Sequence, residues 1–355
     1  MPAISIDTFF ACSLMVLLVL SAMAATANLS SPIISGAFDA EASRRFREIA
    51  EHMLLSVGEP PNWGQNGQTV PETFGLAKAD ADNPYELDID KVSRLNGENL
   101  YALSYAQIFK SLGIQDATFS LEIKPFFDTH VNLLKIFAGL DETTYEFEVY
   151  TSKNGAQVSA VLRHYVIAEN FLEPSNPQHS DGVKRLNVTL PNNVNGPALM
   201  VVFALSYFNE KIASFSVYQF AHNSPKPVHK GAFLKLSPLN YSLTVSMVYA
   251  ETVLHRAYAL TFNYSSELTK TAGANQTATF SIPKLLDSSP IVFVVTGWNS
   301  TEFFTEWTTY PQIPLQMGPA LKDSPNLSNV FVYSYPITVG SVICQCTIWL
   351  GGPRQ

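Results

Sequence analysis

The sequence is poor in charged residues. Only 15% of its 355 residues are charged, whereas about a quarter is usual in soluble domains. The formal net charge is −8, and no run of lysine or arginine follows residue 47. A protein that binds a phosphate backbone needs a face rich in these two residues. Nucleic acid is therefore excluded as a partner.

Motifs that carry metal or catalytic chemistry are also missing. The 7 histidines are scattered singly, and neither a His-x-x-x-His nor a His-Glu-x-x-His pattern occurs. The sequence has no Gly-x-Ser-x-Gly elbow and no P-loop. Asp128 and His130 come nearest to a metal or acid–base pair, although such neighbours more often belong to a turn. We predict no catalytic residues, no metal and no cofactor, and only a triad assembled from distant residues stays open.

Cysteine is scarce, with Cys12, Cys344 and Cys346 as its only occurrences. Residues two apart on a strand point to the same face, and their Cα atoms lie roughly 6.5–7 Å apart. That separation is at the limit of what a disulfide can span, and a second cysteine pair for a metal is absent. We expect Cys344 and Cys346 to be small buried hydrophobes, and a strained Cys-x-Cys bridge is the alternative.

Uncharged, mostly apolar residues fill positions 9–27. A helix over this segment would span roughly 28 Å, close to the thickness of a bilayer core. Its apolar side chains favour insertion by about 3 to 4 kcal/mol in total, so Asp7 should sit at the membrane edge. Because no lysine or arginine precedes the segment, we predict a retained anchor in the lipid bilayer. A cleaved signal peptide is the alternative, since small residues at 22–27 provide cut sites.

Helical patterns continue after the apolar segment. Apolar residues recur every three or four positions from Phe38 to Leu54, with charged residues between them, which is typical of an amphipathic helix. The stretch "GEPPNWGQNGQTVP" at 58–71 predicts a loop. Beyond it, "LDIDKVSRLN" and "ENLYALSYAQIFKSLG" predict two short helices, and Gly113 ends the second.

The period then changes to that of β-strands. Apolar and polar residues alternate in "TFSLEIK" and in "TYEFEVYTSKNG", and Asn154-Gly155 predicts a type I′ hairpin turn. "PALMVVFALSY" is nearly continuous apolar, which predicts a strand buried on both faces. Further short strands follow a Pro-bearing linker at 223–230. The predicted fold class is α+β: a long N-terminal transmembrane and amphipathic helix, then mostly antiparallel, β-sandwich-like head domains.

Four domains follow from these patterns. The predicted bounds are 1–35 for the transmembrane helix, 36–115 for the amphipathic helix and helical neck, 116–223 for a first β-rich domain and 229–355 for a second.

The first 65 or so residues resemble a known family. "AISID" followed by a long apolar helix is similar to the start of archaeal type IV pilin-like proteins. "MLLSVGEPPNWG" at 53–64 resembles the turn after the amphipathic helix of archaeal membrane-anchored surface proteins. The resemblance implies that Asp7 pairs with a neighbour's terminal amine, and hence that the chain self-associates through its N-terminal helix. Only Met1 and Pro2 precede Ala3, so an interfacial Asp7 that merely ends the apolar run is the other interpretation.

Two observations bear on which side of the membrane the head faces. Arginines at 44–47 would keep it inside, but they lie at the limit of the reach of the positive-inside rule. Asn-x-Ser/Thr sequons favour the outside, where they accept glycans. These sequons lie at Asn28, Asn187, Asn240, Asn263, Asn275, Asn299 and Asn326. We therefore expect a single-pass membrane glycoprotein with an extracellular head.

The most distinctive part of the C-terminal half is "GWNSTEFFTEWTTYPQIPLQMG", at 297–318. Its aromatic side chains form a candidate stacking surface for a glycan or a partner protein. The residues of this candidate surface are Trp298, Phe303, Phe304, Trp307 and Tyr310. The alternative is a loop whose aromatic side chains fold back over the end of a sandwich.

These patterns together predict a membrane-anchored cell-surface protein of archaeal type with a structural or adhesive role and no catalysis. A type IV pilin-like filament subunit is the first alternative. A secreted or tethered hydrolase is the second.

Overall fold

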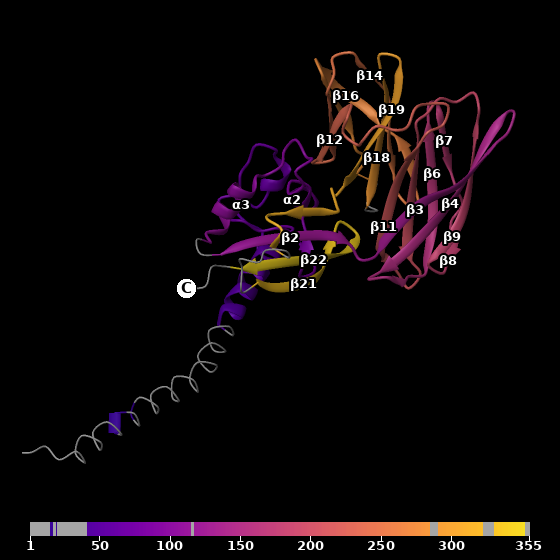
Figure 1. The fold of residues 1–355 in the computed structure, drawn as a ribbon. Helices are drawn as coiled ribbons and strands as arrows, with labels where there is room; N and C mark the ends of the chain where they lie inside the picture. The colour runs from indigo at the N-terminus through magenta and orange to yellow at the C-terminus, as the bar shows by residue number, and fades with distance from the viewer. Residues whose placement is uncertain are drawn as a thin grey trace, which may run out of the picture. The chain divides into compact units, whose positions relative to one another are not determined.

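The computed structural model describes Met15, Val16, Val19 and residues 41–114, 117–284, 290–321 and 330–351. The chain divides into two compact units, 1–51 and 52–355. In the first unit, residues 41–51 are helical, as the amphipathic pattern predicts. In the part of the chain that the structure describes, the β-sheets lie in the second unit (Figure 1).

The predicted α+β class with a long N-terminal transmembrane and amphipathic helix is wrong. The described chain is mainly β, in several sheets, and its helices are short. The helices that the structure describes in full after residue 55 are η1 (Trp63–Gln65), α2 (Ile89–Ser93) and α3 (Tyr105–Leu112). None of the helices in the described ranges is long and apolar enough to cross a bilayer. Of the anchor expected at 9–27, all but Met15, Val16 and Val19 lies outside the described residues.

The two short helices were predicted longer than they are. α3 begins only after Ser104, whose side chain accepts from the Gln107 amide while the Gln107 side chain caps the Ser104 amide. This reciprocal capping box fixes the start of the helix. Gly113 ends α3 in the left-handed conformation (φ 66°), as the sequence predicts.

Residues 128–220 form a first β sandwich. One sheet has the order β3-β4-β5 with β9 on β4, and the other has the order β11-β10-β6-β7 with β8 on β6. Asn154 and Gly155 join β4 to β5 with φ values of 51° and 83°, which confirms a turn of the predicted kind. The strands are β3 (Asp128–Ala138), β4 (Glu142–Lys153), β5 (Ala156–Gln157), β6 (Ala160–Ala168), β7 (Phe171–Pro174), β8 (Gln178–Ser180), β9 (Val183–Pro191), β10 (Ala198–Ser206) and β11 (Asn209–Phe220).

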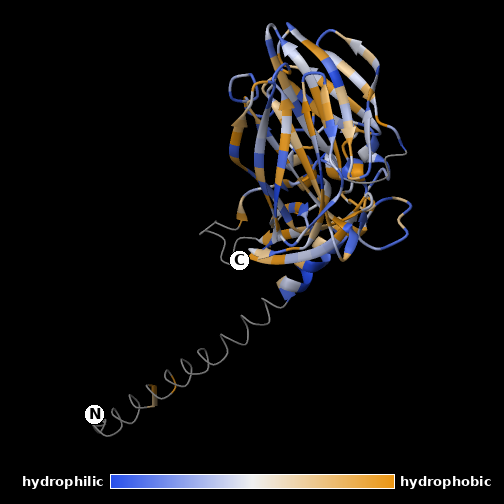
Figure 2. Cartoon of the chain, turned by 90° about the vertical axis from the view of Figure 1, so that its right-hand side faces the viewer, coloured by the Kyte–Doolittle hydropathy of each residue, from blue (hydrophilic) through white to orange (hydrophobic). Residues whose placement is uncertain are grey.

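Residues 234–310 form a second β sandwich. Its sheets have the orders β12-β13-β17-β16 and β15-β14-β18-β19, all antiparallel. Apolar and polar residues alternate along many strands of the chain (Figure 2). In the second sandwich, buried and more exposed positions alternate along β13 and β17, so these strands have one face in the core. The strands are β12 (Leu234–Leu239), β13 (Ser242–Met247), β14 (Thr252–Leu260), β15 (Ser265–Glu267), β16 (Thr269–Ala274), β17 (Thr277–Ser281), β18 (Ile291–Asn299) and β19 (Glu302–Tyr310).

β10 is buried on both faces, as its continuous apolar run predicts. Met200 and Val202 point into the core of the first sandwich. Val201 and Phe203 point the other way, into a cluster shared with Tyr258 and other residues of the second sandwich. This apolar contact joins the two sandwiches directly.

A fifth sheet combines strands that are far apart in the sequence. Its order is β1-β21-β22-β2-β20, where β1 is parallel to β21 and the other pairs are antiparallel. Residues within the ranges 36–115, 116–223 and 229–355 therefore contribute strands to this one sheet. The strands are β1 (Glu86–Leu87), β2 (Thr118–Pro125), β20 (Leu315–Met317), β21 (Val330–Val339) and β22 (Val342–Gly351).

Cys344 and Cys346 lie on β22, and both are buried and free of disulfides. Burial raises the pKa of both thiols, that of Cys344 to about 12. The expectation that they are small buried hydrophobes is confirmed. Cys12 lies outside the described residues.

Candidate ligand-binding cleft

Three segments that are distant in the sequence enclose a cleft. They are the loop 97–100 after α2, the segment 230–236 that leads from the linker into β12, and residues 306–308 of β19. The cleft has a volume of about 370 Å³, which lies within the range of small-molecule sites. Leu100, Leu234, Leu236 and Trp307 supply its apolar walls.

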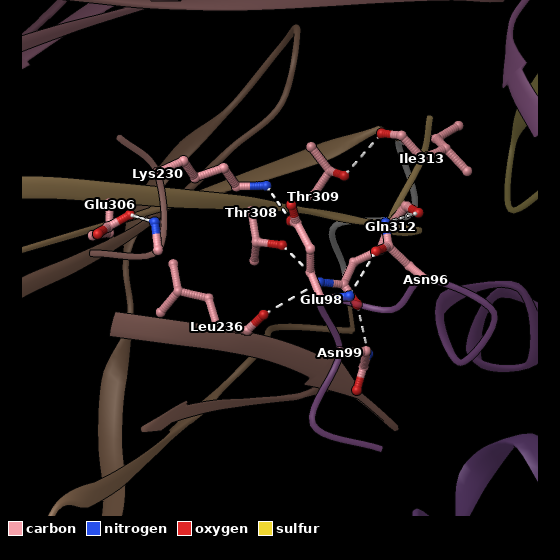
Figure 3. A network of polar contacts seen from close by, with 11 residues as sticks. Asn96, Glu98, Asn99, Lys230, Leu236, Glu306, Thr308, Thr309, Gln312 and Ile313 are labelled. Carbon is pink, nitrogen blue, oxygen red and sulfur yellow. Dashed lines mark hydrogen bonds and ion pairs between the residues drawn. The ribbon is translucent and has the colours of Figure 1, made fainter. Parts of the chain in front are cut away.

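A buried polar network holds the floor of the cleft (Figure 3). The Gln312 side chain donates to the Leu236 carbonyl (3.2 Å) and to Thr308 Oγ1 (2.9 Å). Its Oε1 accepts from Asn99 Nδ2 at 2.6 Å, and Asn96 Nδ2 donates to the Gln312 carbonyl at 3.0 Å. Gln312 and Asn99 are both buried. Because each of these groups is satisfied, the network fixes the loop against the second sandwich.

Glu306 holds the end of the linker. Its carboxylate accepts from the backbone N–H groups of Gly231 (2.7 Å) and Phe233 (3.0 Å). Burial raises the pKa of Glu306, while these backbone hydrogen bonds act in the opposite direction. The Phe233 ring stacks on Phe304 with centroids 4.7 Å apart. The linker therefore enters β12 along a defined path.

Charged side chains lie at the rim of the cleft. Lys230 Nζ is 2.5 Å from Glu98 Oε2 and 4.3 Å from the centroid of the Trp307 ring. Leu100 is exposed beside them. Exposed ion pairs contribute only about 0–1 kcal/mol, so Lys230 and Glu98 can rearrange around a ligand at little cost.

Arg94, the residue directly after α2, fastens the loop 58–71. Arg94 donates to the carbonyls of Trp63, Asn66, Gly67 and Tyr101, and burial lowers its pKa to about 10. The guanidinium also lies over the Trp63 ring, 5.5 Å from the centroid. These contacts bury Trp63 under the loop.

The structure separates the five aromatic residues of the candidate stacking surface. They lie on β18 and β19, not in a loop. Phe303, Phe304 and Tyr310 are buried, whereas Trp298 and Trp307 are partly exposed. Trp307 lines the cleft, and Trp298 packs edge-on against Phe303 away from it. One continuous aromatic surface is therefore not formed.

Other predicted residues are scattered. Asp128 and His130 are exposed on β3, and the described residues contain no group of three metal-ligating side chains. Asn187, Asn240, Asn263 and Asn275 are exposed, and Asn299 is partly exposed and accepts from Thr252 at 3.2 Å. Asp7, Asn28 and Asn326 lie outside the described residues.

Sequence reasoning missed Asn99, Lys230, Glu306 and Gln312. No motif links them, because Asn99 and Gln312 are 213 positions apart. The one local signal was the pair of turn-forming residues Asn96 and Gly97 after α2, which marks a loop but not its partner.

The comparisons with known proteins add little. No known protein family and no curated protein matches the sequence. HBP35 of Porphyromonas gingivalis aligns over 52% of this chain with a TM-score of 0.19 and 14% identity, and the match spans 64% of the HBP35 chain. Human GIVD cytosolic phospholipase A2 aligns over 67% of this chain and 33% of its own, with a TM-score of 0.14 and 7% identity. Scores this low carry no argument, and the pilin-like resemblance stays a prediction.

Proposed function

We propose that this chain is a non-catalytic binding protein presented at the cell surface, with an adhesive or structural role. Its ligand occupies the cleft between the loop 97–100, the segment 230–236 and β19. The observation that carries the proposal is the construction of this cleft: a satisfied, buried network supports a concave site whose rim side chains are free to rearrange.

The lining of the cleft favours a glycan as the ligand. Leu100, Leu236 and Trp307 offer apolar surface to the C–H face of a sugar ring. Glu98 and Lys230 stand at the rim, where hydroxyl groups can replace their mutual contact. A sugar has both kinds of surface, so it matches both parts of the site.

An extracellular position is supported by the sequons. Those at Asn187, Asn240, Asn263 and Asn275 are all exposed in the folded chain, as glycan acceptors must be. Mass spectrometry of the protein from its native cells should find glycopeptides at these sites, and protease added to intact cells should remove the head. Unmodified sites together with full protection from protease would contradict this position.

Binding is tested on an array of neutral and acidic oligosaccharides with the full-length chain. Leu100→Asp places a charge on the apolar wall and should weaken any array signal by about tenfold or more. Lys230→Met should weaken it less, because only a rim contact is lost. Lys78→Met is the matched control, since Lys78 forms a comparable ion pair with Glu86 (2.6 Å) away from the cleft. An array without signal, or a signal that Leu100→Asp leaves unchanged, would refute the proposal.

A further inference from the structure

The end of the hairpin between β3 and β4 is unusually apolar for an exposed segment. Residues 133–140 read "LLKIFAGL" and contain a single charge. The exposed fractions are 40% for Leu134, 57% for Ile136, 55% for Phe137 and 99% for Leu140. The hairpin extends past the neighbouring strands (Figure 1). Several exposed apolar side chains gathered in one short segment mark it as a candidate interaction site.

The same segment has a free backbone edge. In the described chain β3 pairs with β4 alone, so it is an edge strand of its sheet. The Gly139 amide donates to the Glu142 carbonyl (2.8 Å) and therefore points toward β4. Since backbone groups alternate in direction along a strand, those of Ile136 and Ala138 point to the open edge.

This edge lacks most of the features that prevent an edge strand from pairing with a strand of another molecule. It has no proline, and β3 is 11 residues long. A bulge between Leu133 and Lys135 precedes the exposed part, and Lys135 is its one charged side chain. Long apolar edges pair readily with another strand unless such features block them.

We propose that β3 pairs antiparallel with β3 of a second copy of the chain, about a two-fold axis at Ile136. In this register Ile136 faces its own counterpart, and Lys135 faces Phe137. The lysine stem then packs on an aromatic ring, and its ammonium lies near the ring face. An axis at Lys135 would instead oppose two like charges, which destabilises a strand pair. The proposal is independent of the ligand cleft.

A second copy suits this edge better than a lipid surface. Asp141 and Glu142 follow directly after Leu140 at the tip of the hairpin. These carboxylates would be repelled by anionic headgroups and are costly to bury in lipid. In the strand pair they stay in water at its two ends. The pairing also satisfies the open donors and acceptors of Ile136 and Ala138, which lipid cannot do.

Cysteine cross-linking of the full-length chain in detergent tests the pairing. Ile136→Cys places two thiols about 5.5 Å apart between Cα atoms, which a disulfide can span. A mild oxidant should convert most of this variant to a covalent dimer. Val332→Cys is the matched control, because Val332 is exposed to 55% on another strand. The unsubstituted chain measures the background from Cys12. Equal dimer yields from all three chains would refute the register.

The mass in solution provides the second measurement. Light scattering at micromolar concentration should show a dimer, and Ile136→Lys should weaken its association by about tenfold or more, because it places two charges at the axis. Val332→Lys should leave the mass unchanged. A monomeric unsubstituted chain would refute the proposal. An Ile136→Lys variant that keeps the mass of a dimer would refute it as well. If that variant lost its binding to lipid vesicles and kept the dimer mass, the segment would be a lipid-binding site instead.

Discussion

Replacing the buried carboxyl group of Asp90 by an amide should stabilise the protein. Asp90 lies buried at the start of α2, where Oδ1 accepts from the Asn240 amide (2.8 Å) and from the Tyr310 hydroxyl (2.7 Å). Burial raises the pKa of Asp90 to about 6, from a usual 3.8. The two hydrogen bonds and the Arg94 charge oppose this rise, and the Asp88 charge adds to it.

The sign of the effect follows from proton linkage. Between pH 4 and pH 6 the folded chain keeps a proton on Asp90 that the unfolded chain has released. This contribution to stability is complete below the unfolded pKa, and it is lost as the pH rises through about 6. A pKa of about 6 against 3.8 corresponds, at about 1.4 kcal/mol per unit, to about 3 kcal/mol at neutral pH.

Asp90→Asn removes the charge and keeps an oxygen for both hydrogen bonds. We expect the free energy of unfolding to rise by up to about 3 kcal/mol at pH 7.5 and to change little at pH 4. Urea titrations of both chains at several pH values measure this difference. Burial also lowers the pKa of His164 to about 4, so this histidine makes the stability of both chains rise with pH. Because its contribution is the same in both chains, it cancels when their free energies of unfolding are subtracted.

Asp82→Asn is the control, because Asp82 is exposed and its replacement should change the stability little. An Asp90→Asn variant that is less stable than the original chain at pH 7.5 would refute the reasoning. It would mean that the ionised carboxylate is held favourably by Arg94.

Three further changes test other parts of the fold. Gln312→Leu removes the side-chain hydrogen bonds to Asn99, the Leu236 carbonyl and Thr308, so urea unfolding should show a loss of about 2–4 kcal/mol; a neutral effect would contradict the role of the network. Arg94→Met removes one hydrogen bond from each of four carbonyls and should cost about 3–5 kcal/mol in the same assay, while a loss under 1 kcal/mol would contradict this role of Arg94. Cys344 and Cys346 should resist a thiol reagent until urea is added, and rapid labelling of the native chain would disagree with their burial.

Local patterns predicted the local structure. Alternation located β2 and β4, Asn154-Gly155 located a hairpin, and the unbroken apolar run of β10 predicted burial on both faces. In each case the signal lies in neighbouring side chains. Side chains alternate between the two faces of a strand, and a type I′ turn requires residues that accept positive φ. Helix lengths were overestimated because the capping residue Ser104 lies inside an apolar pattern that looks continuous.

Partners across the sequence could not be predicted. β2 pairs with β22 over residues 118–125 and 344–351, although more than two hundred positions separate them. An apolar strand fits many partners equally well, and register depends on the whole core. The same limit applies to the cleft, whose floor joins Asn99 to Gln312. Such sites exist only after the chain has folded.

β19 carries four of the five aromatic residues of the candidate stacking surface, and it also borders the cleft. A loop was the alternative interpretation of the segment 297–318. The strand in fact runs to Tyr310 and ends where Pro311 lacks a donor for the ladder. Since successive side chains point to opposite faces, Glu306 holds the linker while Trp307 packs toward the contact between the sandwiches. A ligand that moves Trp307 therefore acts on both sandwiches through one strand.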